Sequence, residues 1–154
     1  ASDVYKRQAL DFIHSDRSIF KIVDLDEAWA FLNVAQGETL SNKLVRAGRA
    51  MNAGVYFVTQ SSGDVSKESL KNNIGLKFAF RSTDTNEIKQ TLEFFGLDSE
   101  DENNQKRLRD LENGQCLMQD LYGRVGVVQI HPVFVELLHA FDTRPPIKSE
   151  VDLE

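Results

Sequence analysis

The chain has 154 residues, of which 41% are hydrophobic and 27% are charged, and this is enough for one compact domain with a core. Its formal net charge of -6 argues against a module that grips nucleic acid by itself, because non-specific binding depends on clustered Lys and Arg. The single cysteine, Cys116, excludes an internal disulfide. We find no apolar stretch long enough to cross a bilayer and no secretory signal peptide, which would be a basic and then apolar leader with a cleavage site. We therefore expect a soluble cytosolic protein.

Both ends of the chain differ in character from its middle. Residues 1–8 lack an initiator Met and resemble a translated library adaptor, so we expect them to be a non-native leader. Residues 143–154 contain two adjacent prolines and finish with acidic residues, which is typical of a flexible tail. The domain proper is therefore expected at residues 9–142.

Two continuous apolar runs, at residues 19–25 and 54–59, are typical of strands buried on both faces of a parallel sheet. Between them, from Gly37, apolar residues recur at helical spacing and predict a helix. Strand, helix and strand make a βαβ unit, which brings the carboxyl ends of both strands to one edge of the sheet.

A third strand is predicted at residues 76–80, followed by a helix. Asp84 and Glu87 resemble a capping pair at its start, and Gly96 follows its last apolar residue. Ser99 with Glu102 repeats the capping pattern before a charged segment, which predicts a solvated surface helix.

The C-terminal part predicts a β-hairpin from residues 115–119 and 124–130, and then a helix that starts at Pro132. The apolar residues of that helix are expected to pack on the sheet: Val133, Phe134, Leu137, Leu138 and Phe141. The predicted class is therefore α/β, with a mostly parallel sheet flanked by helices and a C-terminal hairpin and helix.

Polar residues follow each predicted strand. Asp26 and Glu27 end the first, Gln60 the second and Arg81 the third. Ligands of open α/β sheets bind beyond the carboxyl ends of the strands. A nucleoside triphosphate site uses these groups: one carboxylate for Mg²⁺, a second for the attacking water, an amide that senses the γ-phosphate, and a cation.

Each of these residues also has an ordinary structural interpretation. Glu27 is equally suited to be an acidic residue at a helix N-terminus, and Gln60 to be turn material after a strand. Arg46 and Arg49, on the helix between the first two strands, suit a solvated helix face. The order and spacing of the whole set favour a nucleotide site over these readings.

Four stretches together resemble the conjugative-transfer ATPases of type IV secretion systems, of the VirB and TraC type: DEAWAFL, LVRAGRAMNAGVYFVTQ, FAFRSTD and NGQCLMQD. The resemblance covers about residues 9–141. These proteins belong to the RecA-like FtsK and HerA group of hexameric motors. The resemblance implies the C-terminal half of a RecA-like P-loop NTPase domain that uses ATP and Mg²⁺.

Site roles follow from the resemblance. It implies that Asp26 is the Walker B magnesium residue, Glu27 the catalytic base and Gln60 the sensor glutamine. It further implies that Arg46 or Arg49 acts in trans as an arginine finger, and Arg81 is a further candidate for the cation.

The resemblance also implies partners and a location. We expect a homo-hexamer at the cytoplasmic, inner face of the cell membrane, docked on conjugation or type IV secretion proteins. Contact with nucleic acid would be indirect or made by other regions, given the acidic balance.

Two features depart from the family pattern. No G-x-x-x-x-G-K-[ST] motif occurs, so the phosphates lack their cradle and these 154 residues alone are expected to be inactive. Asp24 adds a carboxylate two residues before Asp26, and we expect it to find a partner or to lie near an exposed strand end. Lys21 is a candidate partner only if the strand is at an edge.

Two alternatives remain open at this point. The first is a double-stranded DNA translocase of the FtsK and HerA type, which the acidic charge disfavours. The second is a non-catalytic RecA-like scaffold used for assembly. A Walker A motif encoded upstream of Ala9 supports the motor, whereas a start codon close to Ala9 supports the scaffold.

Overall fold

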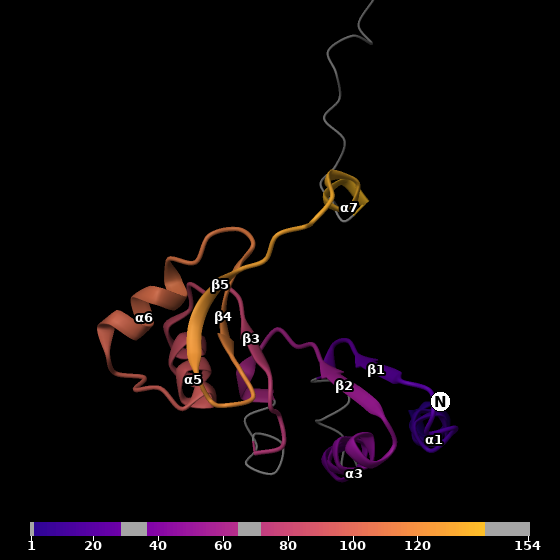
Figure 1. Ribbon diagram of the computed structural model, residues 1–154. Helices are drawn as coiled ribbons and strands as arrows, with labels where there is room; N and C mark the ends of the chain where they lie inside the picture. Colours follow the sequence, from indigo (N-terminus) through magenta and orange to yellow (C-terminus); the bar gives the residue numbers. More distant parts are fainter. Residues whose placement is uncertain (1, 29–36, 65–71, 141–154) are drawn as a thin grey trace, which may run out of the picture.

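The computed structural model describes residues 2–28, 37–64 and 72–140 (Figure 1). The tail predicted at residues 143–154 lies outside these ranges. The N-terminal half contains α1 (Ser2–Ile13), β1 (Lys21–Leu25), α3 (Gly37–Ala50), β2 (Ala53–Phe57) and the short 3-10 helix η1 (Ser62–Asp64). The C-terminal half contains β3 (Lys77–Ala79), α5 (Thr85–Phe95), α6 (Glu102–Arg109), β4 (Gln115–Gln119), β5 (Val125–Gln129) and α7 (Val135–Ala140).

The βαβ unit is confirmed, since β1 and β2 pair in parallel and α3 connects them. The register places Asp24 beside Tyr56. α3 packs closely on β2 because residue 48 is Gly: a Cβ there would lie 2.8 Å from the carbonyl oxygen of Ala53. β1 and β2 thus end side by side, as the sequence predicts.

The predicted C-terminal hairpin is also confirmed. β3, β4 and β5 form an antiparallel sheet in that order, and β4 and β5 meet at a turn in which Gly123 adopts a φ of 77°. The α/β class holds. The expectation of a mostly parallel sheet needs correction for the described residues, because parallel pairing there is limited to β1 and β2, and β3 is not hydrogen-bonded to β2.

α5 is capped at both ends. Asp84 is its N-cap and accepts a hydrogen bond from the Glu87 N–H, and Gly96 ends it with a φ of 75°. Its last four carbonyls all find donors outside the helix ladder: Leu92 O from Leu97 N, Glu93 O from Gly96 N, Phe94 O from Lys77 Nζ, and Phe95 O from Gln119 Nε2. Two of these donors are side chains of β3 and β4, so the end of α5 is fixed to the antiparallel sheet.

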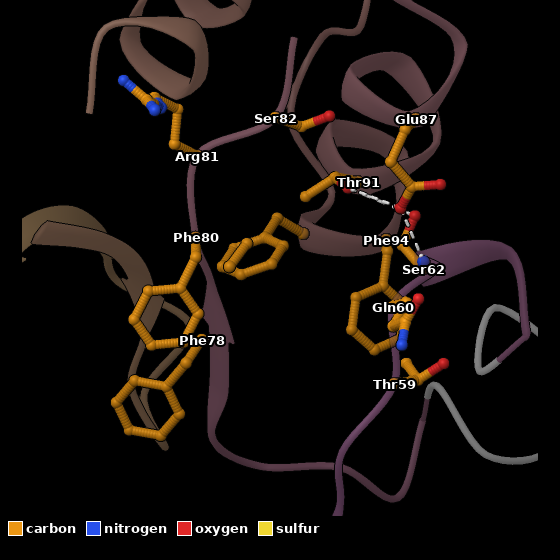
Figure 2. Close-up of a pocket in the computed structure, with 12 residues that line it drawn as sticks. Thr59, Gln60, Ser62, Phe78, Phe80, Arg81, Ser82, Glu87, Thr91 and Phe94 are labelled. Carbon is orange, nitrogen blue, oxygen red and sulfur yellow. Dashed lines mark hydrogen bonds between the residues drawn. The ribbon is translucent and has the colours of Figure 1, made fainter. Parts of the chain in front are cut away.

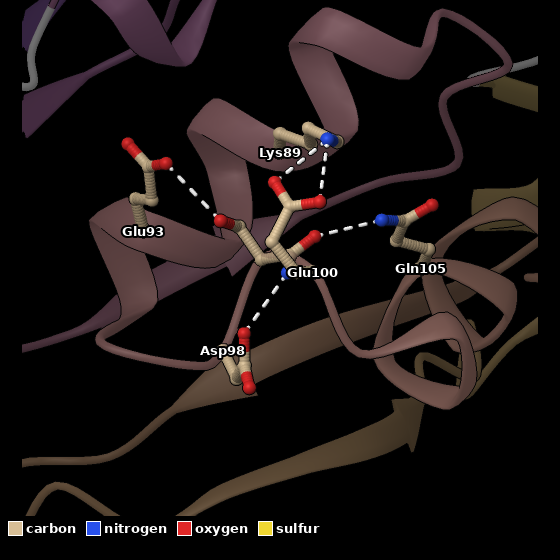
Figure 3. Close-up of polar contacts among 6 residues, drawn as sticks. Lys89, Glu93, Asp98, Glu100 and Gln105 are labelled. Carbon is tan, nitrogen blue, oxygen red and sulfur yellow. Dashed lines mark hydrogen bonds and ion pairs between the residues drawn. The ribbon is translucent and has the colours of Figure 1, made fainter.

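The connection from α5 to α6 corrects one predicted cap. Asp101, not Ser99, is the N-cap of α6, and it accepts from the Asn103 N–H. Ser99 instead donates its hydroxyl to Glu93 Oε1, 3.1 Å away. Figure 3 shows this link beside the ion pair of Lys89 and Glu100. The Ser99 pattern failed because the chain makes another turn before the helix starts.

The main core lies between α5 and the strands. Ile88, Leu92, Phe94 and Phe95 of α5 are buried there, and Leu25, Phe57 and Ala79 from three strands pack against them. The core therefore links the parallel pair to the antiparallel sheet. The opposite face of the strands is open in the described part, where several apolar side chains are exposed: Ile22, Tyr56, Val58, Phe78 and Phe80.

α7 stands apart from both sheets (Figure 1). Val133, Phe134, Leu137 and Leu138 are all exposed, so the expectation that they pack on the sheet is wrong for these four; Phe141 lies outside the described residues. The reason is that β5 ends at Gln129 and the chain then leads away from the sheet before α7 begins. No helix in the described ranges is both long enough and apolar enough to span a membrane.

Candidate nucleotide site

The two acidic residues after β1 lie on a tight turn. Glu27 has a φ of 52°, and its N–H donates to Asp26 Oδ1 at 2.9 Å. The turn is anchored to β2, because the Ala28 N–H donates to the carbonyl of Val58 at 2.8 Å. Both carboxylates are exposed, so they are open to a ligand.

Asp24 does not belong to this turn. It lies on the exposed face of β1, as expected for a carboxylate without a buried partner. Lys21 points to the other face, is only 3% exposed, and donates its Nζ to the carbonyls of Ser15 and Asp16. Lys21 is therefore occupied elsewhere.

Gln60 and Glu27 are brought together as the sequence predicts. The Gln60 Nε2 donates to Glu27 Oε1 at 2.8 Å, across the carboxyl ends of β2 and β1. Both side chains are exposed. The amide is therefore placed directly against the carboxylate that the sequence singles out for water activation.

Arg81 lines a cavity of about 340 Å³ together with Thr59, Gln60 and Glu87. The cavity lies between the ends of β2 and β3, and Figure 2 shows the Arg81 guanidinium pointing away from Gln60 and Glu87. The structure thus brings Arg81 to the rim of the same site, but not to the carboxylates.

The other two arginines are not part of this cavity. Arg46 is exposed on α3 and lines a separate surface hollow with Asn72, Asn73 and Asp120. Arg49 lies on α3, and its side chain is outside what the structure describes. The described part of the chain therefore does not bring Arg46 to its own acidic turn.

The sequence missed one residue of this region. Glu87 was predicted only as a capping partner of Asp84, yet its carboxylate accepts from the Ser61 hydroxyl at 2.9 Å and the Ser62 N–H at 2.7 Å. The Asp84 N–H is instead 3.3 Å from Ser82 Oγ. Nothing in the spacing could have shown this, because the contact joins residues 25 and 26 positions apart.

The donor set suits Mg²⁺ held jointly with phosphate. Mg²⁺ is usually bound by one or two carboxylates, with water and phosphate oxygens as the other ligands. Among the described residues no group of three or more His, Cys, Asp or Glu could hold a metal alone. Asp26, exposed beside Glu27, fits the first arrangement and would supply one carboxylate ligand.

A family model described as "AAA-like domain" matches residues 4–141 of the chain. The chain belongs to this family. This AAA-like domain is also 34% identical, over 119 residues, to a Bacillus subtilis (strain 168) protein named "Uncharacterized protein YddE". The match covers 77% of the chain and 14% of YddE. The expected family resemblance is confirmed. The match to the family model begins at residue 4, inside residues 1–8, which were predicted to be a non-native leader.

Solved structures show the same fold. VirB4 of Thermoanaerobacter pseudethanolicus superposes with a TM-score of 0.69 at 15% identity, over 84% of the AAA-like domain and 36% of VirB4. The genome packaging NTPase B204 of Sulfolobus turreted icosahedral virus 2 gives a TM-score of 0.67 at 14% identity, over 85% of the domain and 63% of B204. B204 has also been solved with ATP-gammaS. The predicted α/β fold is therefore confirmed, and it is shared with VirB4 and with the packaging NTPase B204.

Proposed function

We propose that this AAA-like domain supplies the water-activating and γ-phosphate-sensing half of an ATPase site, in a motor of a conjugative-transfer or type IV secretion apparatus. One observation carries this proposal: the 2.8 Å hydrogen bond from Gln60 to Glu27 at the carboxyl ends of two parallel strands. A carboxylate with an amide fixed beside it is what hydrolysis of a γ-phosphate requires. The fold shared with VirB4 and B204 supports it.

Each group of the site has its own role. Asp26 would hold Mg²⁺, and the ion would supply positive charge against the phosphates. Glu27 accepts a proton from the attacking water. Gln60 donates to Glu27 through one N–H of its side-chain amide, and the second N–H is available to the γ-phosphate. The exposed position of both acidic residues leaves room for the nucleotide.

The phosphate cradle comes from a segment outside the 154 residues. In the described part, β2 and β3 belong to separate sheets, and the cavity between their carboxyl ends is bordered by the apolar side chains of Phe78 and Phe80. A strand that pairs there and a helix on the open face would cover the exposed apolar residues of both sheets. A loop between that strand and helix would lie beside Gln60 and Arg81.

Arg46 or Arg49 acts on a neighbouring subunit. Arg46 is exposed and remote from the cavity that holds Gln60, which suits a group that reaches the site of the next copy in a ring. We therefore propose a homo-hexamer that docks on secretion proteins at the cytoplasmic face of the membrane.

A DNA-translocating motor is the second candidate, because the fold of the genome packaging NTPase B204 matches nearly as well as that of VirB4. The net charge of -6 means that DNA contacts would come from other regions. A non-catalytic scaffold is the third candidate. It would be excluded if the intact polypeptide hydrolyses ATP and a Glu27 variant loses that activity.

The test is Glu27→Gln in the intact polypeptide that carries these residues. We expect ATP binding to persist while hydrolysis falls about 10²-fold to 10⁴-fold, because the water loses its base. Glu93→Gln, an exposed carboxylate on α5 away from the cavity, is the matched control and should keep wild-type turnover. Unchanged turnover in Glu27→Gln would remove the catalytic role from this turn.

A further inference from the structure

The carboxylate of Glu87 is directed at the loop that follows Gln60. Glu87 lies in the first turn of α5, where its backbone N–H is bound by Asp84. Its Oε2 accepts from the Ser61 hydroxyl at 2.9 Å and its Oε1 from the Ser62 N–H at 2.7 Å. Both oxygens of the carboxylate therefore bind the loop, and Figure 2 shows the contact with Ser62.

Further contacts tighten this junction. Thr91, one turn along α5 and 5% exposed, donates its hydroxyl to Ser62 Oγ at 3.2 Å. The Gly63 N–H donates to Ser61 Oγ at 3.3 Å. Hydrogen bonds to an ionised carboxylate are stronger than those between neutral groups, and here they act in a partly buried setting. The loop after Gln60 is thus fixed to α5.

The segment before Gln60 is fixed as well. The Val58 N–H donates to the Leu25 carbonyl at 3.0 Å, and the Val58 carbonyl accepts from the Ala28 N–H at 2.8 Å. Gln60 therefore lies between two anchored points, one on β1 and one on α5. The anchors on both sides fix the backbone at Gln60, so only the side chain of Gln60 must still be ordered for its amide to reach Glu27.

We propose that Glu87 is a positioning residue for the nucleotide site: it holds the loop of residues 61–63 so that the Gln60 amide meets Glu27. This role rests on the proposed ATPase function. Because the contact comes from α5, the position of that helix determines whether the sensor is in place. Glu87 itself acts only through Gln60.

The first test is turnover of Glu87→Ala in the intact polypeptide. We expect kcat to fall about tenfold while the KM for ATP stays within about twofold, because a displaced sensor affects the chemical step more than binding. Glu87→Gln keeps an oxygen that can accept from the Ser62 N–H and should restore most of the activity. Ser61→Ala removes one of the two bonds to Glu87, together with the bond from the Gly63 N–H, without altering α5. It should give a smaller fall, because the Ser62 N–H still binds Glu87.

A double-mutant cycle with Gln60 separates positioning from general damage. If Glu87 acts through Gln60, Glu87→Ala combined with Gln60→Ala has the kcat of Gln60→Ala alone. Losses that multiply would overturn the proposal. Glu93→Ala on the same helix is the control, since its carboxylate contacts Ser99 and not the loop.

A structural readout completes the test. Amide exchange at Ser62 should be slow in the wild type and faster in Glu87→Ala, while the buried amides of α5 stay protected in both. If Glu87→Ala keeps the wild-type kcat while Glu27→Gln is inactive, the role of Glu87 is overturned and the proposed ATPase function is retained. Wild-type turnover in Glu27→Gln overturns both.

Discussion

The side-chain amide of Gln60 donates a 2.8 Å hydrogen bond to the carboxylate of Glu27, although 33 residues separate them in the chain. The bond joins the ends of two parallel strands at the solvent-exposed edge of the sheet. Exposed polar pairs contribute little to stability, so this geometry is of interest mainly for chemistry.

Replacing the amide of Gln60 by a carboxylate tests this pair. Gln60→Glu removes the donor and places a like charge beside Glu27, so steady-state ATP hydrolysis of the intact polypeptide should fall by roughly 10-fold to 100-fold. Gln129→Glu makes the same chemical change on exposed β5 and should leave hydrolysis unchanged. Equal turnover in both variants would contradict the role of Gln60.

Lys77 should stabilise the fold despite its charge. It is 8% exposed, and its Nζ donates to the carbonyl of Phe94 at 2.8 Å and lies 4.6 Å from the centre of the Phe94 ring. Lys77→Ala should lower the free energy of unfolding by about 2–3 kcal/mol, because a carbonyl at the end of α5 loses its donor. Urea denaturation measures this. Lys106→Ala, on exposed α6, should change it by less than about 0.5 kcal/mol.

Gly96 and Gly126 offer a matched pair for backbone strain. A Cβ at either position would meet nothing within 4 Å, but Gly96 has a φ of 75° and Gly126 has no left-handed backbone. Gly96→Ala should therefore cost about 1 kcal/mol, and Gly126→Ala should be neutral or slightly stabilising. Thermal unfolding of both variants measures the two changes in stability. Equal losses would mean that packing, not φ, sets the cost at Gly96.

The thiol of Cys116 should be unreactive in the folded protein. It is fully buried, and desolvation raises its pKa above the ordinary value. The raised pKa contributes stability that is fully present below about pH 9 and is lost as the pH rises through the folded pKa. A thiol-specific reagent should label Cys116 only on unfolding. Cys116→Ala should show a weaker decline in stability above about pH 9 than the wild type.

The open apolar face should make the isolated 154-residue chain associate with itself. Phe78 of β3 is 50% exposed, and Phe80, just after that strand, is 60% exposed. One edge of β3 is unpaired in the described part. Phe80→Lys should lower the weight-average mass in sedimentation experiments without lowering the thermal midpoint. Phe95→Lys, at a position only 3% exposed, should unfold the chain. An unassociated wild-type chain would contradict the prediction.

Local sequence signals predicted much of the fold. The apolar runs at residues 19–25 and 54–59 predicted β1 and β2 as strands of a parallel pair. Burial on both faces, which such runs indicate, is not seen in the described part, where Ile22 and Tyr56 are exposed. Asp84 and Gly96 predicted both ends of α5, since each acts within one helical turn. The neighbourhood of Gln60 and Glu27 followed from the βαβ topology alone.

Features that depend on distant parts of the chain were not predictable. The N-cap of α6 is Asp101 and not Ser99, because the chain makes another turn before the helix, and in that turn Ser99 binds Glu93 of α5. α7 was expected to pack on the sheet because its residues are largely apolar. An apolar face shows only that a helix can be buried, and not which surface it packs against. Glu87 looked like a capping residue, and only the tertiary fold shows that its carboxylate binds the loop after Gln60.

α5 is fastened at its two ends to different parts of the protein. At its start Glu87 binds the loop beside Gln60, and at its end the carbonyls of Phe94 and Phe95 bind side chains of β3 and β4. An eleven-residue helix held in this way behaves as a stiff rod. A shift of the antiparallel sheet would therefore displace the whole helix and, through Glu87, the loop beside Gln60.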